Sequence, residues 1–306
     1  INHNEYLNFF DLSKYKNNFQ IIKESRKRIS EDTSILDFEE FLQDILEKLE
    51  NKGFKLLLLL DEFEKLQEGI DSGLTSPQVP ENLRALLQQY ENFTVLLTSG
   101  LRGLKQLNED YWSVLFGLGP TLQVPNLNED DSKLLIVEPV KEYVTYTDEA
   151  INEIYYLTNG QPFLIQLLCD EIYGFAASNQ LRIISKATVE HARDKYSIYQ
   201  SYFHVLWNLL GSNISKLILV IIFREYQKSE LVQLKSILVT LQNYGIRVIK
   251  SKIYTDYIKE LMDYDLIKLE KEIYKPAMPL MGKWFENTQD FNSLILLSKE
   301  EVIENE

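Results

Sequence analysis

The most regular feature of the hydrophobic pattern is a run of five leucines, Leu56–Leu60, that ends in Asp61 and Glu62. A short, continuously apolar run is typical of a strand that is buried on both faces of a parallel sheet. Its polar end is then expected at the carboxyl edge of the sheet, where open α/β folds bind their ligands. The pattern therefore predicts a core strand over residues 54–60 with two carboxylates at a candidate binding edge. A core strand that merely stops at a solvated acidic turn would show the same pattern.

Helical and strand patterns alternate around this run. Apolar residues recur every three or four positions over 37–53 and again over 81–90, which predicts two amphipathic helices. A second apolar run, 93–97, ends in Thr98 and Ser99. Strands that alternate with helices, with polar residues at the strand ends, favour a parallel α/β sheet.

Two further segments complete the first part of the chain. Residues 5–12 have the composition of an earlier strand, and the glycines and prolines between 69 and 80 predict a loop. The longest apolar runs are much shorter than the roughly 18–20 residues of a membrane-spanning helix. We therefore expect no membrane-spanning segment.

After Pro125 the apolar spacing becomes helical throughout. The predicted helices cover 129–137, 147–158, 162–177, 186–199, 213–226, 229–243 and 252–263. A short hairpin is predicted over 265–276, and 287–306 are predicted to be a fraying tail. Three helices followed by a hairpin is the element order of a winged helix. The aromatic side chains near this end are expected in the core rather than against a ligand: Tyr274, Trp284 and Phe285.

Composition narrows the functional classes. The chain has 306 residues, enough for two or three modules. Cys169 is its single cysteine, so an intrachain disulfide or a cysteine-based zinc site is excluded and a reducing, cytoplasmic location is expected. The first residues lack the basic start and apolar core of a signal peptide. Because the first residue is Ile1 rather than Met, we expect a fragment, a processed product or a trimmed chain.

The charge of the chain is uneven. The net charge is −14, which makes the whole chain a poor general binder of nucleic acid or of anionic membranes. Residues 211–285 nevertheless hold twelve Lys and Arg against eight Asp and Glu. This basic surplus fits a separate surface role for that part, or ordinary variation between modules.

Four features in this order carry a resemblance to a known family. Residues 155–169, which include Leu-Thr-Asn-Gly-Gln-Pro, resemble the Leu-Thr-Gly-Gly-His-Pro region that opens a lid helix in the prokaryotic STAND class of AAA+-related P-loop ATPases. Residues 274–285 look like the end of the winged helix in the same class. Together with the Asp-Glu and Thr-Ser strand ends, the resemblance covers most of residues 37–285.

The resemblance implies an α/β fold with three modules. A parallel P-loop-type sheet with helices, N-terminally incomplete, would occupy residues 1–125. A helical lid would follow over 126–210 and a winged helix over 211–286, with the tail at 287–306.

The resemblance also implies roles at the strand ends. Asp61 matches the Walker B acid that holds Mg²⁺, mostly through water, and Glu62 the acid that polarises the attacking water. Thr98 or Ser99 matches the polar sensor of the γ-phosphate, although both could simply cap a helix. Arg102 lies just beyond and could reach phosphate, or could be a solvated surface residue.

In the lid, Gly160 and Pro162 match the pair that contacts the base or ribose of ATP or ADP. The glycine would let the backbone approach the nucleotide closely. The alternative is a helix that stops at Gly160 and a new helix that starts with Pro162 at its first position.

One required motif is absent from the 306 residues. No Gly-x-x-x-x-Gly-Lys-Ser/Thr occurs, because the only Gly-Lys pair, at 282–283, is followed by Trp284. That loop cradles phosphates in P-loop ATPases. We expect that the loop precedes this chain or is omitted from it, rather than that the protein is a degenerate relative. Met278 is followed by Pro279, so the Met-His-Asp triplet that senses ADP is also missing, and His204 is a weak substitute.

Three functions remain open. The first is a molecular switch in signalling or antiviral defence, in which exchange of ADP for ATP rotates the winged helix away and permits association with itself or with other protein chains. The second is an initiator-like DNA-binding ATPase, in which helix 252–263 enters the major groove and Lys268, Lys271 and Lys275 contact phosphates. Acidic residues on the same elements oppose it. The third is a scaffold that has lost turnover.

Overall fold

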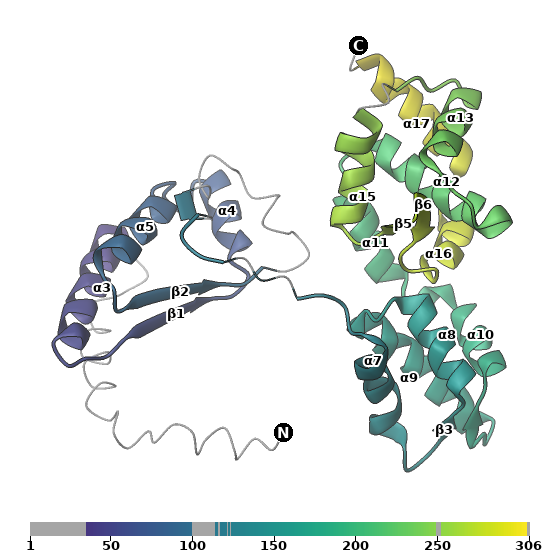
Figure 1. Ribbon diagram of the computed structural model, residues 1–306, viewed down its shortest axis with the longest axis horizontal. Coiled ribbons are helices and arrows are strands. Elements are labelled where there is room, and N and C mark those ends of the chain that lie inside the picture. Colours follow the sequence, from purple (N-terminus) through teal and green to yellow (C-terminus); the bar gives the residue numbers. More distant parts are fainter. Residues whose placement is uncertain are drawn as a thin grey trace. The chain divides into compact units, whose positions relative to one another are not determined.

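The computed structural model describes residues 35–99, 114–115, 117–120, 122, 124–248 and 252–304 (Figure 1). The chain forms two compact units, Ile1–Gln123 and Val124–Glu306. The strand predicted over residues 5–12 lies outside the described residues.

The described residues of the first unit include two parallel strands. Strand β1 (Leu56–Leu60) pairs with β2 (Phe93–Leu97) in a register that runs from Leu56 opposite Phe93 to Leu60 opposite Leu97. The helices of this unit are α3 (Ile35–Glu50), α4 (Glu64–Asp71) and α5 (Val79–Gln89). Both strands and the helices around 37–53 and 81–90 confirm the prediction from the apolar pattern.

In the part of the chain that the structure describes, only one face of the two strands is covered, which corrects the prediction that β1 is buried on both faces. Successive strand residues point to opposite sides. Leu56 and Leu58 face the side that packs against α3 and α5, whereas Leu57 and Leu59 are 56% and 62% exposed. Leu96 of β2 is 49% exposed as well. The unbroken leucine run could not show this alternation, because every position is equally apolar.

The segment predicted as a loop over 69–80 is also corrected. Gly69 lies inside α4, which ends at Asp71, and Pro80 lies in the first turn of α5. A proline is tolerated there because the first N–H groups of a helix have no intrahelical partner. The loop is therefore shorter than the glycine and proline content indicates.

The first part of the second unit is a group of helices. It contains α7 (Glu129–Val137), the 3₁₀ turn η4 (Glu138–Val140), α8 (Asp148–Thr158), α9 (Pro162–Ser178), α10 (Lys186–Arg193), the 3₁₀ turn η5 (Tyr196–Ile198) and α11 (Gln200–Leu209). Two short parallel strands, β3 (Thr145–Tyr146) and β4 (Ile183–Ile184), join its loops. The predicted helices over 129–137, 147–158 and 162–177 are confirmed. The helix predicted over 186–199 is wrong, because it ends at Arg193 and α11 was not anticipated.

The second part begins with α12 (Asn213–Ser229) and α13 (Leu234–Asn243). The π-helical segment η6 (Ile253–Ile258) and α15 (Lys259–Asp263) follow, and then the antiparallel hairpin of β5 (Ile267–Glu270) and β6 (Ile273–Pro276). The hairpin and the helices predicted at 213–226 and 252–263 confirm the prediction, whereas the helix predicted over 229–243 begins only at Leu234, because α12 extends to Ser229. The π-helical start was not predicted. It brings Ile253 and Ile258, both fully buried, to one side, because a π-helical turn joins residues five apart.

Residues 287–304 are not a fraying tail, which corrects the prediction for this part of 287–306. Helix α16 (Met281–Thr288) is followed by α17 (Phe291–Glu304), which packs along α12. The carboxylate of Glu301 accepts hydrogen bonds from the Ser212 hydroxyl (2.5 Å) and from the backbone N–H of Asn213 (2.7 Å). An acidic side chain at a helix N-terminus satisfies free N–H groups there and is stabilised by the helix dipole. The last helix thus caps α12.

A single continuous core fills the second unit, from Ile136 of α7 to Ile295 of α17. It contains the three aromatic side chains that were expected in the core, since Tyr274, Trp284 and Phe285 are all buried. No helix among the described residues combines the length and the apolar character needed to cross a bilayer.

Cys169 on α9 gives a first test of this packing. Burial raises the pKa of the Cys169 thiol to about 12, so that little reactive thiolate is present near neutral pH. We expect iodoacetamide at pH 8 to alkylate the folded protein about a thousand times more slowly than the urea-unfolded protein. Mass spectrometry measures the rate of alkylation at Cys169 directly, because the chain has one cysteine. Equal rates in the two states would contradict the enclosed position.

Candidate functional site

The carboxyl ends of β1 and β2 bring the two polar strand ends together. The backbone N–H of Thr98 donates to the carbonyl of Leu60 (2.9 Å), and the N–H of Phe63 donates to the carbonyl of Thr98 (3.1 Å). These bonds continue the parallel ladder by one residue past the strands. Phe63 is 1% exposed and anchors the turn in the core. Asp61 and Glu62 are therefore held beside Thr98 and Ser99, at the edge where the sequence places its candidate residues.

Asp61 is fixed by two hydrogen bonds to the same oxygen. The Thr98 hydroxyl donates to Asp61 Oδ1 at 2.5 Å, and the backbone N–H of Glu62 donates to it at 2.9 Å. The Thr98 bond, followed by the Glu62 bond, lowers the pKa of Asp61 below its usual value. An exposed carboxylate that stays ionised and has a fixed orientation suits the coordination of a hard cation such as Mg²⁺.

Glu62 has an unusual backbone conformation. Its φ is +49°, in the left-handed region that costs a non-glycine residue about 1–3 kcal/mol. This conformation accompanies the turn of its N–H toward Asp61, while its own side chain remains exposed to solvent. The strain lies at the position of the predicted water-polarising acid. Ser99 is half-buried one residue beyond Thr98, and Arg102 lies outside the described residues.

Gly160 and Pro162 lie in the second unit, at the corner where α8 turns into α9. Asn159 and Gly160 both have positive φ, the Gln161 side chain accepts from the N–H groups of Phe163 and Leu164, and Pro162 opens α9. The sequence reasoning missed the capping role of Gln161, which is rarer at this position than Ser, Thr, Asp or Asn. The local structure is therefore that of one helix, α8, that ends before Gly160 and of a second helix, α9, that begins with Pro162.

The close backbone approach at Gly160 is made to another part of the chain. The N–H of Leu127 donates to the carbonyl of Gly160 (2.9 Å), and a Cβ at residue 160 would lie 2.0 Å from the carbonyl oxygen of Leu127. Pro162 is exposed. The predicted contact of this pair with a nucleotide remains a prediction.

Comparisons with known proteins bear on the fold. No protein-family model matches the chain, and no curated protein matches it. One similar solved structure is that of ORC2 from Aeropyrum pernix, described as ADPNP–ADP complexes. The matched region spans 95% of this chain and 75% of the ORC2 chain, with 16% sequence identity and a TM-score of 0.53. A second is a Walker-type ATPase of Pyrococcus abyssi, for which the matched region spans 90% of this chain and 76% of the ATPase chain. Its sequence identity is also 16% and its TM-score 0.53. The fold of this chain is therefore similar to that of these two proteins.

The described residues contain no group of three or more His, Cys, Asp or Glu that could hold a metal ion by themselves. Mg²⁺ at nucleotide sites typically takes one or two carboxylates and completes its shell with water and phosphate oxygens. Asp61, with its lowered pKa and fixed carboxylate, fits such a partial set. A metal there would depend on the nucleotide for most of its ligands.

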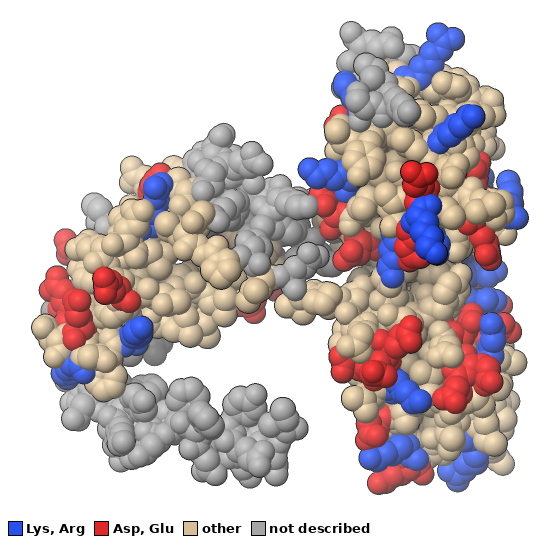
Figure 2. All heavy atoms as spheres, in the orientation of Figure 1, with Lys and Arg blue, Asp and Glu red and all other residues tan. Residues whose placement is uncertain are grey.

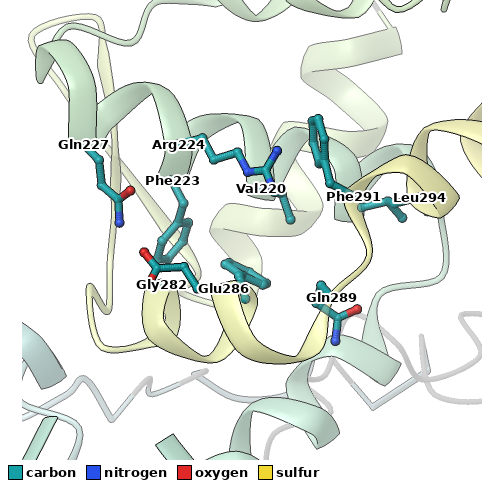
Figure 3. Close-up of a pocket in the computed structure, with 10 residues that line it drawn as sticks. Val220, Phe223, Arg224, Gln227, Gly282, Glu286, Gln289, Phe291 and Leu294 are labelled. Atoms are coloured by element: carbon teal, nitrogen blue, oxygen red, sulfur yellow. The ribbon is translucent and has the colours of Figure 1, made fainter. Parts of the chain in front are cut away.

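Two hollows lie in the second unit. One, of about 40 Å³, is enclosed between α12, α16 and α17, where the Arg224 guanidinium lies 3.8 Å from the centre of the Phe291 ring (Figure 3). It is far below the roughly 300–1,000 Å³ of small-molecule sites. The other, of about 440 Å³, separates α8 from the β5–β6 hairpin and is lined by Tyr155, Tyr156 and Lys275 among others. Its lysine is paired with Glu270 at 2.7 Å, and acidic side chains gather over the neighbouring helices α7 to α10 (Figure 2).

Proposed function

We propose that this chain is the main part of an ATP- and ADP-binding molecular switch of STAND type, which uses Mg²⁺ and controls self-association. The similarity in fold to ORC2 and to the Walker-type ATPase supports nucleotide binding as the general function. The observation that carries the proposal is the hydrogen bond between Thr98 and Asp61 at the carboxyl edge of two parallel strands. It joins the residues that match the sensor and the Walker B acid in that class.

Each residue of the edge then has a defined task. Asp61 would hold Mg²⁺ through water, and the metal would neutralise charge on the phosphates. Glu62 would orient and polarise the attacking water. Because the Thr98 hydroxyl is bonded to Asp61, Thr98 would orient that carboxylate, and Thr98 or Ser99 would act as the polar sensor of the γ-phosphate. Arg102 would add positive charge near the phosphates.

The sequence of this chain contains no phosphate-binding loop. That loop supplies most phosphate contacts in P-loop ATPases, through backbone N–H groups and a lysine. We therefore expect weak nucleotide binding by these 306 residues alone. Strong binding is expected from a longer polypeptide that contains both this chain and such a loop.

Glu62→Gln is the direct test of hydrolysis. The amide keeps the size of the side chain but cannot accept a proton, so ATP turnover should fall by a factor on the order of 10²–10⁴. Binding of a fluorescent ATP analogue should change little, since Glu62 is not a phosphate contact in this scheme. The assay uses the intact protein, with Glu91→Gln as the matched control, because Glu91 is an exposed glutamate at the other end of the sheet. Unchanged ATP turnover in Glu62→Gln would contradict the role of Glu62 as the acid that polarises the attacking water. If the parent protein binds nucleotide but does not hydrolyse ATP, the scaffold that has lost turnover would be favoured.

An initiator-like ATPase is the second candidate, favoured by the fold shared with ORC2. In this alternative, a winged helix would contact DNA through the helical segment 252–263 and the β5–β6 hairpin. Two hairpin lysines already have partners within the chain, because Lys268 donates to Asn159 and Lys275 to Glu270. A salt-dependent gel shift that survives alanine substitution of Lys252, Lys259 and Lys271 would exclude DNA binding by this face.

A further inference from the structure

The hollow of about 440 Å³ lies entirely within the second unit, and no residue of the strand edge contributes to it. Its walls come from the start of α7, from α8, from the end of α12 and from the β5–β6 hairpin. The volume falls within the roughly 300–1,000 Å³ that is typical of small-molecule sites. The side chains that line the hollow therefore decide which class of ligand it suits.

Three tyrosines form the aromatic part of the lining. Tyr155 and Tyr156 are consecutive on α8, and Tyr226 lies on α12. The Tyr155 ring is placed by the neighbouring corner, since a Cβ at Gly160 would lie 3.2 Å from its Cε2 atom. Burial, and then the nearby Tyr226, raise the pKa of Tyr156, so that both hydroxyls belong to one neighbourhood. The faces of such rings attract organic cations.

The two lysines of the lining are already engaged within the protein. The Lys275 ammonium is paired with Glu270 at 2.7 Å, and this hydrogen bond raises the pKa of Lys275. The Lys268 ammonium donates to the side-chain oxygen of Asn159. Burial raises the pKa of Asp265, and the charge of Lys268 opposes that rise, so Lys268 also lies near a carboxylate. An anionic ligand would have to compete with these contacts.

The charges that remain around the hollow are mostly negative. Glu129, in the first turn of α7, lines the hollow and has no ion pair among the described residues. Glu230, just past the end of α12, lies close enough to contribute to the raised pKa of Lys275. Glu153 and Lys186, which are also nearby, offset each other in a pair at 2.8 Å. Aromatic faces beside an unpaired carboxylate are the surroundings that a positively charged group prefers.

We propose that this hollow is a binding site for an organic cation, in which an ammonium or guanidinium group lies against Tyr155, Tyr156 and Tyr226 with the Glu129 carboxylate as its counter-ion. A free small molecule and an arginine or lysine side chain of another polypeptide both carry this group. The site goes beyond the proposed function, because it does not depend on nucleotide binding at the strand edge.

Titration calorimetry of the full chain, in about 150 mM NaCl to screen weak surface attraction, tests the preference for positive charge. The probes are acetyl-Gly-Arg-Gly-amide and the same peptide with citrulline, which keeps the shape of arginine but is neutral. The arginine peptide should bind about tenfold more tightly or better. Equal affinities of the two peptides, or no saturable binding of the arginine peptide, would overturn the proposal.

Two smaller probes, arginine amide and tetramethylammonium, distinguish the sources of the cation. If either binds as tightly as the peptide, the site recognises a free small molecule. If the peptide binds about tenfold more tightly than both, the site recognises a side chain of another polypeptide. Either result supports a cation site.

Substitutions test whether the cation binds in the hollow. Glu129→Gln and Tyr156→Leu should each weaken binding of the arginine peptide about fivefold or more, whereas Tyr156→Phe keeps the ring and should stay within about twofold of the parent. Asp130→Asn is the matched control, because Asp130 is exposed and follows Glu129 but does not line the hollow. Equal losses in Glu129→Gln and Asp130→Asn would indicate general attraction to an acidic surface and overturn the proposal.

Lys275→Gln separates a cation site from an anion site. It removes a positive charge and releases Glu270, so the arginine peptide should bind about threefold more tightly or better. The substituted side chains of all these variants are exposed or half-buried, so we expect the variants to fold. Weaker binding of the arginine peptide in Lys275→Gln, or saturable binding of inorganic phosphate that this variant abolishes, would overturn the proposal in favour of an anion site.

Discussion

Gly160→Ala should destabilise the second unit strongly, by about 3 kcal/mol or more. Two effects add. The φ of +71° is unfavourable for alanine, and the new Cβ would lie 2.0 Å from the carbonyl oxygen of Leu127. That oxygen belongs to the backbone and cannot rotate away as a flexible side chain could. We expect the substitution to loosen the point at which the chain enters the unit.

Gly174→Ala is the matched control, because Gly174 lies inside α9 with open space around its Cα. Alanine favours a helix by about 1 kcal/mol over glycine, so this variant should be as stable as the parent or slightly more so. Urea unfolding followed by the fluorescence of Trp207 and Trp284, which lie in the same unit, measures both. Equal stability of the two variants would show that residue 160 does not need to be glycine.

Leu58→Asp and Leu59→Asp should differ by about 3 kcal/mol in the stability of the first unit, although the residues are neighbours. Leu58 packs against the clusters formed with both α3 and α4, and a carboxylate there would have no partner. Leu59 is 62% exposed, and a carboxylate there would remain in water. The low strand propensity of aspartate applies to both variants and cancels in the comparison.

Hydrogen exchange in α3 and α5 measures this difference for the first unit alone. Protection should collapse in Leu58→Asp and persist in Leu59→Asp. Equal loss in both variants would mean that the outer face of β1 is covered in solution. The exposed leucines make this an informative outcome, since a contiguous apolar surface is uncommon on a monomeric protein.

Much of the fold follows from periodicity. Strands β1 and β2, helices α7, α8 and α9 and the β5–β6 hairpin agree with the prediction, because apolar spacing and terminal polar residues report local structure directly. Helix α17 was missed, since Leu294 and Ile295 are buried in a helix that packs along α12, which is far away in the sequence. The π-helical start of residues 253–258 was missed because a spacing of five resembles an irregular α-helix.

At the candidate site, the residue types and their order were readable from the sequence and their contacts were not. Asp-Glu and Thr-Ser at two strand ends predicted a polar edge. The bond from Thr98 to Asp61 depends on the parallel register of β1 and β2. Likewise, the close approach of backbone at Gly160 was anticipated from the sequence, but the segment that approaches it, at Leu127, was not.

The sequence by itself determined most of the strands and helices and which polar residues follow the strands, because these depend on neighbours a few positions apart. Only the tertiary structure decided which face of the leucine strand is covered and that one core joins Leu127 to the last helix. Those properties depend on contacts between distant segments, such as Leu280 with Leu157 and Trp284 with Trp207. A local pattern shows that a side chain is apolar, but the partner that buries it is chosen only when the whole chain folds.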